Sequence, residues 1–193
     1  MVKNILAKFF RVLTIPPILV TALLTAVYFT RENTFRGVLD LIAAIACLAI
    51  IPSLAYVLQP IIPGFKGKGR DGQRALAFIT SAIGYIVGFV YAFVSGATAD
   101  FKFIIASYLL SVVLLLVFNK VFHLKASGHA CGVLGPLLFM VYFMGWMWAI
   151  PCAVLAVAVV WSSVALSRHT PKELCLGGAC ALAAFASMAL VIL

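Results

Sequence analysis

Long apolar stretches separated by short polar segments run through this chain from end to end. A bilayer core of about 30 Å requires roughly 20 apolar residues in a helix, and seven stretches come near that length. They are Val12–Phe29, Val38–Leu58, Ala75–Ser95, Phe103–Phe122, Ser127–Ile150, Pro151–Ser167 and Pro171–Leu193. The sixth stretch is short, and the turn before it is expected at Ile150-Pro151. The pattern therefore predicts an all-α polytopic transmembrane bundle of about six to seven spans.

No repeat, low-complexity tract or soluble segment interrupts this pattern, so residues 1–193 are predicted to form a single integral membrane domain. Pro16-Pro17, Pro52 and Pro136 lie inside predicted spans and are expected to kink them. The basic N-terminal segment before an apolar run is typical of a signal peptide. Because no small-residue cleavage site follows it, the run is predicted to be retained as the first span.

Composition supports a membrane location. Hydrophobic residues make up 65% of the chain, charged residues only 10%, and the mean hydropathy is +1.20. A soluble domain carries roughly 25% charged residues, so most of this surface is expected to face lipid. The net charge of +9 falls on the loops. In a membrane protein this charge favours anionic lipids and phosphate groups as partners, and not nucleic acid.

The basic residues gather on one side of the predicted membrane. Alternating spans place the N-terminal segment together with the loops Gln59–Arg74, Lys120–Ala126 and Arg168–Thr170. These segments and the residues beside them hold eleven of the 14 basic residues. The positive-inside rule then places them in the cytoplasm, with the cell membrane as the predicted location. If the loops bind phosphate, their charge has a functional cause and carries less information about orientation.

The residues capable of chemistry collect in the same loops. His123, His129 and His169, the three histidines of the chain, lie in or beside them. Arg70 and Arg74 would share one face if their segment begins a helix. This set of residues suits phosphoryl transfer. The cations would hold the anion, one imidazole would attack, and a second imidazole would protonate the leaving oxygen.

The second and third loops each lead into a predicted span through a capping sequence. Lys125 precedes Ser127-Gly128-His129, where Ser127 is well placed as an N-cap and the free amides of the helix start form an anion site. Thr170-Pro171-Lys172-Glu173 begins the last span. A capping box explains Thr170 and Glu173 without any chemistry, and plain capping equally explains Ser127-Gly128. Lys120 and His123 are predicted to lie at the lipid headgroups, and Asp40 to be a helix-start charge.

These residues resemble the motifs of the phosphatidic-acid phosphatase type 2 family, the membrane relatives of vanadium haloperoxidases. The family pattern is Lys, six residues and Arg-Pro; then Pro-Ser-Gly-His; then Ser-Arg, five residues, His, three residues and Asp. Ser127-Gly128-His129 matches the core of the second motif. His169 and Glu173 match the end of the third, with Glu for Asp, and Gln73-Arg74-Ala75 resembles the end of the first without its proline. The resemblance covers roughly residues 60–193.

The resemblance implies a family-like helical core and hydrolysis of a lipid phosphate or diphosphate through a phosphohistidine. His169 would be the nucleophile, Glu173 would orient it, and His129 would be the general acid. Arg74, Ser127 and the Gly128 amide would hold phosphate oxygens, without metal or cofactor. Prenyl diphosphates, phosphatidic acid and phosphatidylglycerol phosphate are all possible substrates. The lipid and the oligomeric state stay open.

Two positions depart from the family pattern. The lysine of the first motif falls on Gly67, and the arginine of the third falls on Ser163. Loss of a bidentate guanidinium is not a conservative change, and Arg70, Lys125 or Arg168 would have to compensate. The alternative function is therefore a catalytically impaired member that binds or moves a phosphorylated lipid. A third is a small transporter or structural membrane protein without phosphate chemistry.

Overall fold

The computed structural model describes residues 6–7, 9–10 and 14–193, and 80% of the chain is helical, with no strand among the described residues. The helices run in the order α2 (Pro16–Thr30), α3 (Val38–Ile45), η1 (Ala46–Ile50), α4 (Ile51–Leu58), α5 (Gly69–Val94), α6 (Ala99–Leu116), η2 (Val117–Val121), α7 (Gly128–Met144), η3 (Trp146–Trp148), α8 (Ala149–Ala165) and α9 (Pro171–Ile192). Each predicted stretch thus contains a helix. The start of the first stretch, with Lys3, Lys8 and Arg11, lies outside the described residues.

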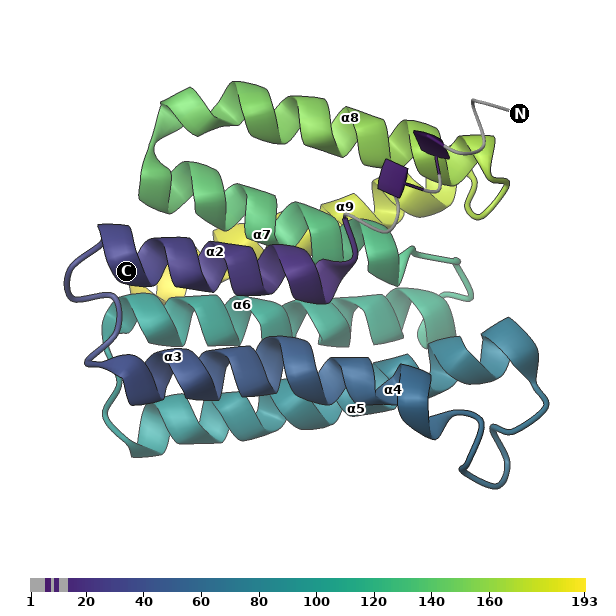
Figure 1. The fold of residues 1–193 in the computed structure, drawn as a ribbon, viewed down its shortest axis with the longest axis horizontal. Coiled ribbons are helices and arrows are strands. Elements are labelled where there is room, and N and C mark those ends of the chain that lie inside the picture. The colour runs from purple at the N-terminus through teal and green to yellow at the C-terminus, as the bar shows by residue number, and fades with distance from the viewer. Residues whose placement is uncertain (1–5, 8, 11–13) are drawn as a thin grey trace.

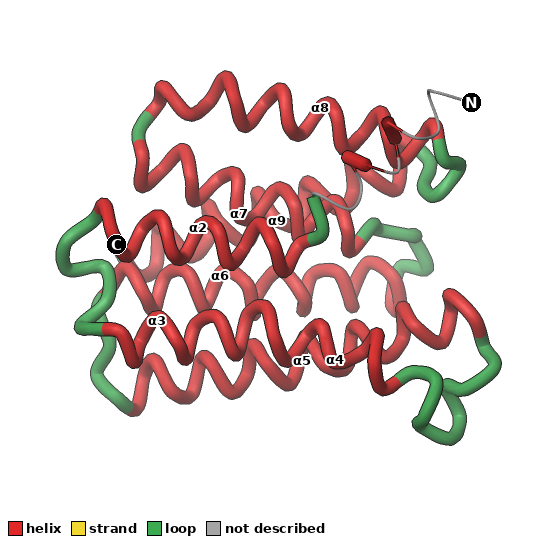
Figure 2. Tube along the Cα trace, in the orientation of Figure 1, coloured by secondary structure: helices red, strands yellow, loops and turns green. Residues whose placement is uncertain are grey.

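Among the residues that the structure describes, five helical stretches are long and apolar enough to cross a membrane: Val38–Leu58, Gly69–Val94, Ala99–Val121, Trp146–Ala165 and Pro171–Ile192. The apolar helices α2 and α7 are shorter. The axes of the long helical stretches and of α2 and α7 run roughly alongside one another (Figures 1 and 2). The chain is accordingly a multi-pass membrane protein built as a helical bundle.

Figure 1 shows the chain reversing direction at two opposite ends of this bundle. The α4–α5, α6–α7 and α8–α9 connections lie at one end, and the α2–α3, α5–α6 and α7–α8 turns lie at the other. The three loops that were predicted to share one side therefore do so. We call the end that carries them the basic end.

The boundary between the fifth and sixth spans was predicted wrongly. The chain turns at Gly145, and not at Ile150-Pro151. Gly145 has φ +94°, a backbone conformation that glycine adopts without the steric penalty of a Cβ atom. Trp146–Trp148 consequently begin the sixth span instead of ending the fifth. Pro151 lies in the first turn of α8, where a missing N–H is tolerated.

Two other helix starts differ from the prediction. Helix α5 begins at Gly69 instead of Ala75, which places Arg70 and Arg74 on the helix, one turn apart. Pro16 and Pro17 lie in the first turn of α2 and do not kink it from within. A fixed φ near −65° suits the first turn of a helix, so the two prolines start α2.

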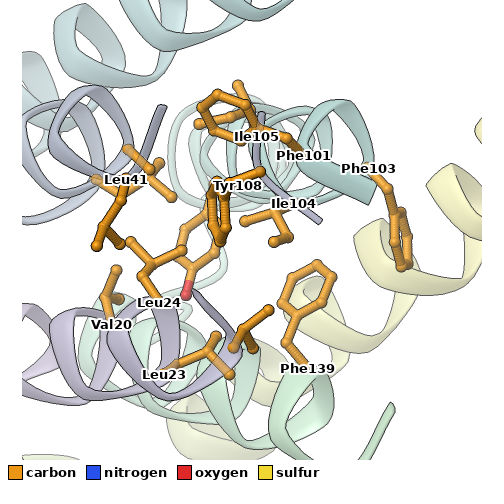
Figure 3. Close-up of a cluster of buried hydrophobic side chains, with 14 of the residues drawn as sticks. Val20, Leu23, Leu24, Leu41, Phe101, Phe103, Ile104, Ile105, Tyr108 and Phe139 are labelled. Atoms are coloured by element: carbon orange, nitrogen blue, oxygen red, sulfur yellow. The ribbon is translucent and has the colours of Figure 1, made fainter. Parts of the chain in front are cut away.

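Helix α6 forms the centre of the bundle. In the apolar stretch of this span 56% of the residues are buried, against 22–33% in the other four candidate spans, because α6 packs against both α5 and α9. Phe101, Phe103, Ile104 and Ile105 are fully buried in the main hydrophobic core (Figure 3). Burial on several sides fits a helix that is apolar around most of its circumference.

Asp40, predicted to be a helix-start charge, anchors the end opposite the basic loops. Its carboxylate accepts from Arg36 Nη2 at 2.7 Å and Nε at 2.9 Å, and from the Tyr91 hydroxyl at 2.8 Å. Arg36 also donates to the Ser95 hydroxyl, so the cluster ties the α2–α3 loop to the end of α5. The hydrogen bond to Asp40 raises the pKa of Arg36. We interpret the cluster as structural.

Candidate functional site

A cavity of about 1230 Å³ opens among the helix ends at the basic end of the bundle. It brings together seven of the eight residues that the sequence singled out: Arg70, Arg74, Lys125, Gly128, His129, His169 and Glu173. The eighth, Ser127, does not line it. These residues come from α5, from the loop before α7 with the first turn of α7, and from the loop before α9 with the first turn of α9. The cavity is thus a site that only the folded chain assembles.

Ser127 begins α7. Its hydroxyl accepts the Ala130 amide at 3.2 Å, and the residue is only 2% exposed. The hydroxyl therefore serves as an N-cap, as the capping interpretation predicted. The family resemblance implied that this same oxygen would hold phosphate. Gly128 and His129 follow in the first turn and line the cavity. The amides of this helix start give the cavity wall a partial positive charge.

His169 and Glu173 are paired at the start of α9. His169 Nδ1 lies 2.9 Å from Glu173 Oε2, and the two side chains are 8% and 22% exposed. The Thr170 hydroxyl accepts the Glu173 amide at 3.3 Å, so capping and pairing occur together. A carboxylate against Nδ1 fixes the imidazole ring and favours the tautomer whose lone pair is on Nε2.

The starts of α7 and α9 are held against each other by backbone contacts. The Ser127 amide donates to the Glu173 carbonyl at 2.9 Å. Gly177, one turn further along α9, lies so close that a Cβ atom there would be 2.2 Å from the Ser127 carbonyl oxygen. The absence of a side chain at position 177 therefore permits the contact. This contact fixes the two histidine-bearing segments relative to each other.

Asn119 holds the same loop from the other side, a role that the sequence analysis missed. Its side-chain amide donates to the Ala126 carbonyl at 3.2 Å and to the Leu115 carbonyl at 2.8 Å. Its Oδ1 accepts the Ala126 amide at 3.2 Å. A lone asparagine near the end of an apolar run was the available signal. Asn119 also lines the cavity, where it positions the loop ahead of His129.

Positive charge dominates the mouth of the cavity. Besides Arg70, Arg74 and Lys125, the lining includes Lys120 and Arg168, against the carboxylates of Asp71 and Glu173. Arg74 lies 4.0 Å from Asp71, whose side chain is 93% exposed, so this ion pair is weak. Lys120 and His123 were both predicted to lie at the headgroups. Lys120 lines the cavity and His123 does not. The surplus of cations suits an anion with more than one charge.

Ser163 stands where the family pattern has an arginine. It is fully buried near the end of α8 and does not line the cavity. Its carbonyl accepts the Arg168 amide at 2.9 Å. Position 163 is therefore packed with the helix bundle, and an arginine there would have to bury its charge. Lys66 and Lys68, which flank Gly67, do not line the cavity either.

The cavity continues inward between α5, α6, α7 and α9, a feature that the sequence analysis did not predict. Its inner lining includes Tyr85, Ser107, Tyr108, Phe139 and Phe185. Serine and tyrosine within the apolar run of α6 were the available signal, since polar groups inside a membrane span are costly and commonly functional.

The cavity also reaches the lipid-facing surface between α2 and α4. Pro17, Ile18 and Ser53 border both the cavity and an apolar groove of about 790 Å³. Along this groove Phe29 and Ile50 are 77% and 55% exposed. The site is thus connected both to the basic end and to the region where lipid chains lie.

Comparison with protein-family models, with curated proteins and with solved structures finds no match to this chain. Within residues 6–7, 9–10 and 14–193, no group of three or more His, Cys, Asp or Glu side chains is arranged to hold a metal ion.

Proposed function

We propose that this chain is a divergent phosphatidic-acid phosphatase type 2 protein that hydrolyses a lipid phosphate or diphosphate ester. The observation that carries the proposal is the His169–Glu173 pair, which lines the same cation-rich cavity as His129. Nucleophile, orienting carboxylate, general acid and anion-binding cations are the set that this reaction requires. The short sequence motifs and this shared cavity both support the proposal.

The first half of the reaction forms a phosphohistidine. Glu173 holds the Nδ1 proton, so Nε2 of His169 attacks phosphorus and a P–N bond forms. The bond between phosphorus and the lipid oxygen breaks in line, and His129 donates a proton to that oxygen. Arg70, Arg74 and the Gly128 amide stabilise the phosphoryl oxygens, whose charge is largest in the transition state.

The second half of the reaction releases phosphate. His129, now neutral, takes a proton from a water molecule as that water attacks phosphorus. The P–N bond breaks, inorganic phosphate leaves, and both histidines return to their initial state. One imidazole thus serves as acid and then as base, as the reversal of the same geometry requires.

The decisive test is phosphate release from a panel of lipid mono- and diphosphates by the purified protein in detergent. We expect release that is unchanged by EDTA, because imidazoles and organic cations supply every step. Strict dependence on Mg²⁺ would contradict the histidine mechanism and point to another site. The absence of release from every lipid would reject the enzyme.

An amphiphilic substrate fits the connection between the cavity and the groove. The phosphate would lie among the cations while an apolar chain leaves between α2 and α4. We expect Ala22→Trp, at a groove position that is not part of the cavity lining, to lower turnover of a long-chain lipid phosphate about tenfold, or roughly 1.4 kcal/mol.

Two comparisons make this prediction specific. A short, water-soluble phosphate monoester should be hydrolysed at the natural rate by Ala22→Trp, because it does not need the groove. Ala153→Trp, on the exposed face of α8, should affect neither substrate. Equal loss for long and short substrates would argue against entry through the groove.

A binding function is the second candidate, and the burial of Ser163 favours it. The guanidinium that would clamp the transition state is missing, and removing one hydrogen-bond donor to a transition-state oxyanion commonly costs a hundred- to a thousand-fold in rate, or about 2.7–4 kcal/mol. Arg70, Lys125 and Arg168 line the cavity and are the candidates to replace it. Tight binding of a lipid phosphate without turnover would identify the binder.

We also place the basic end on the cytoplasmic side of the membrane, following the charge rule.

A further inference from the structure

Two hydroxyl groups on α6 are buried at the inner part of the cavity. Ser107 and Tyr108 are 4% and 5% exposed, and both line the cavity. Within the described part of the chain neither Ser107 Oγ nor Tyr108 Oη has a hydrogen-bond partner. Burying such a group without a partner is costly, so nearly all buried polar groups in proteins are satisfied. Two unsatisfied hydroxyls on adjacent residues of the cavity wall point to a ligand that accepts their hydrogen bonds.

The Tyr108 ring is fixed by its neighbours. It packs edge-on against Tyr85 with centroids 5.6 Å apart, and it stacks on Phe139 at 6.2 Å. Its hydroxyl lies beside Gly135 of α7, where an added Cβ atom would be 3.7 Å away. The ring thus holds its hydroxyl in one place between α6 and α7, as a binding group requires.

The depth of this hydroxyl can be estimated along α7. Gly135 follows His129 by six residues, which corresponds to a rise of about 9 Å. In a phosphorylated glycerolipid, six bonds of roughly 1.5 Å each lead in a zigzag from phosphorus to an acyl carbonyl oxygen. A phosphate held at His129 would therefore bring that carbonyl close to the depth of Tyr108.

We infer that Tyr108 and Ser107 form a second subsite that binds the acyl ester carbonyl of a phosphorylated glycerolipid. The inference rests on the proposed function, because it takes the phosphate to lie among the cations near His129. Hydroxyl donors match the ester carbonyls of an acyl lipid, which accept hydrogen bonds, whereas a prenyl chain offers no acceptor at this depth. The subsite thus selects an acyl glycerolipid phosphate over a prenyl diphosphate.

The test compares a diacylglycerol phosphate with its dialkyl ether analogue, which lacks only the carbonyl oxygens. Binding is measured by the thermal shift of His169→Asn protein in detergent, so the readout does not depend on turnover. We expect the ester to bind roughly tenfold more tightly than the ether, the usual effect of one or two neutral hydrogen bonds. A prenyl phosphate should bind no better than the ether.

Tyr108→Phe, made in the same His169→Asn protein, should bring ester affinity down to that of the ether and leave ether affinity unchanged. Its stability without lipid should not fall, because the hydroxyl has no partner to lose within the described structure. Ser107→Ala should act in the same direction. Tyr142→Phe, at a position outside the cavity lining, is the matched control and should preserve the preference for the ester.

The failures of this inference and of the proposed function are distinguishable. Equal binding of ester and ether, or an ester preference that survives both Tyr108→Phe and Ser107→Ala, would overturn the subsite while phosphatase activity stands. Ester-selective binding without any turnover by the natural protein would support the subsite and reject the enzyme. If no lipid phosphate binds at all, the subsite is overturned.

Discussion

Replacing His169 with asparagine is expected to reduce phosphate release by a thousand-fold or more, the order observed when a covalent nucleophile is removed. Asparagine keeps a side-chain amide that can donate to Glu173, so the start of α9 should retain its structure. The variant lacks a nitrogen able to attack phosphorus. Binding of a lipid phosphate should be largely preserved, since the cations that hold it are unchanged.

A matched control exists in the same end of the molecule. His123 also lies in a basic loop, but it does not line the cavity. Its φ of +52° suits asparagine, which tolerates the left-handed region. His123→Asn should therefore release phosphate at the natural rate. Comparable loss in both variants would indicate a general effect on the basic end instead of a nucleophile.

The covalent intermediate provides the direct measurement. Brief incubation with a lipid labelled in its phosphate should leave label on the natural protein in an acid-labile, alkali-stable form, as a phosphohistidine requires. His169→Asn should carry none. Label retained by His169→Asn would contradict the assignment of the nucleophile even if its turnover is low.

Gly177→Ala is expected to cause the largest loss of stability. The new Cβ atom would lie 2.2 Å from the Ser127 carbonyl oxygen, a backbone atom, so α9 must move away from the start of α7. Overpacking of this kind costs about 1–3 kcal/mol, and it would separate His129 from His169. We expect a lower midpoint of thermal unfolding in detergent, together with nearly complete loss of phosphate release.

The neighbouring glycine offers the control. A Cβ atom at Gly178 would lie 3.4 Å from the end of the Leu134 side chain, an ordinary contact. Alanine is favoured over glycine inside a helix by up to about 1 kcal/mol, so Gly178→Ala should be neutral or slightly stabilising. Equal unfolding midpoints for the two variants would show that the contact between α9 and Ser127 tolerates separation.

These two predictions examine different properties of one arrangement. His169→Asn removes a reacting atom from an intact site, whereas Gly177→Ala leaves every reacting atom present and changes the distance between them. Phosphoryl transfer depends on both, because attack and protonation take place around one phosphorus atom.

The sequence by itself determined the apolar helical bundle, the end of the bundle that three loops share and the caps of α7 and α9. These features follow from local signals: apolar length against a fixed bilayer thickness, and side chains that bond their own helix start. The seven lining residues were predictable to the same extent, because each lies at a helix end that topology brings to the basic end. The pairing of His169 with Glu173 also follows from one helical turn of spacing.

Only the tertiary structure decided the turn at Gly145, the contacts of Asn119 and the surroundings of Ser163 and Tyr108. These features depend on packing between segments that are far apart in the chain. No polar break separates the fifth span from the sixth, so packing and the conformation of Gly145 set that turn. Asn119 reads as an isolated polar residue until the loop before His129 folds onto it. Ser163 and Tyr108 both lie in apolar helices, and only the packed bundle buries the first away from the cavity and places the second in its wall. Which face of an apolar helix meets a cavity depends on its neighbours, and hydrophobic periodicity carries little signal where nearly every face is apolar.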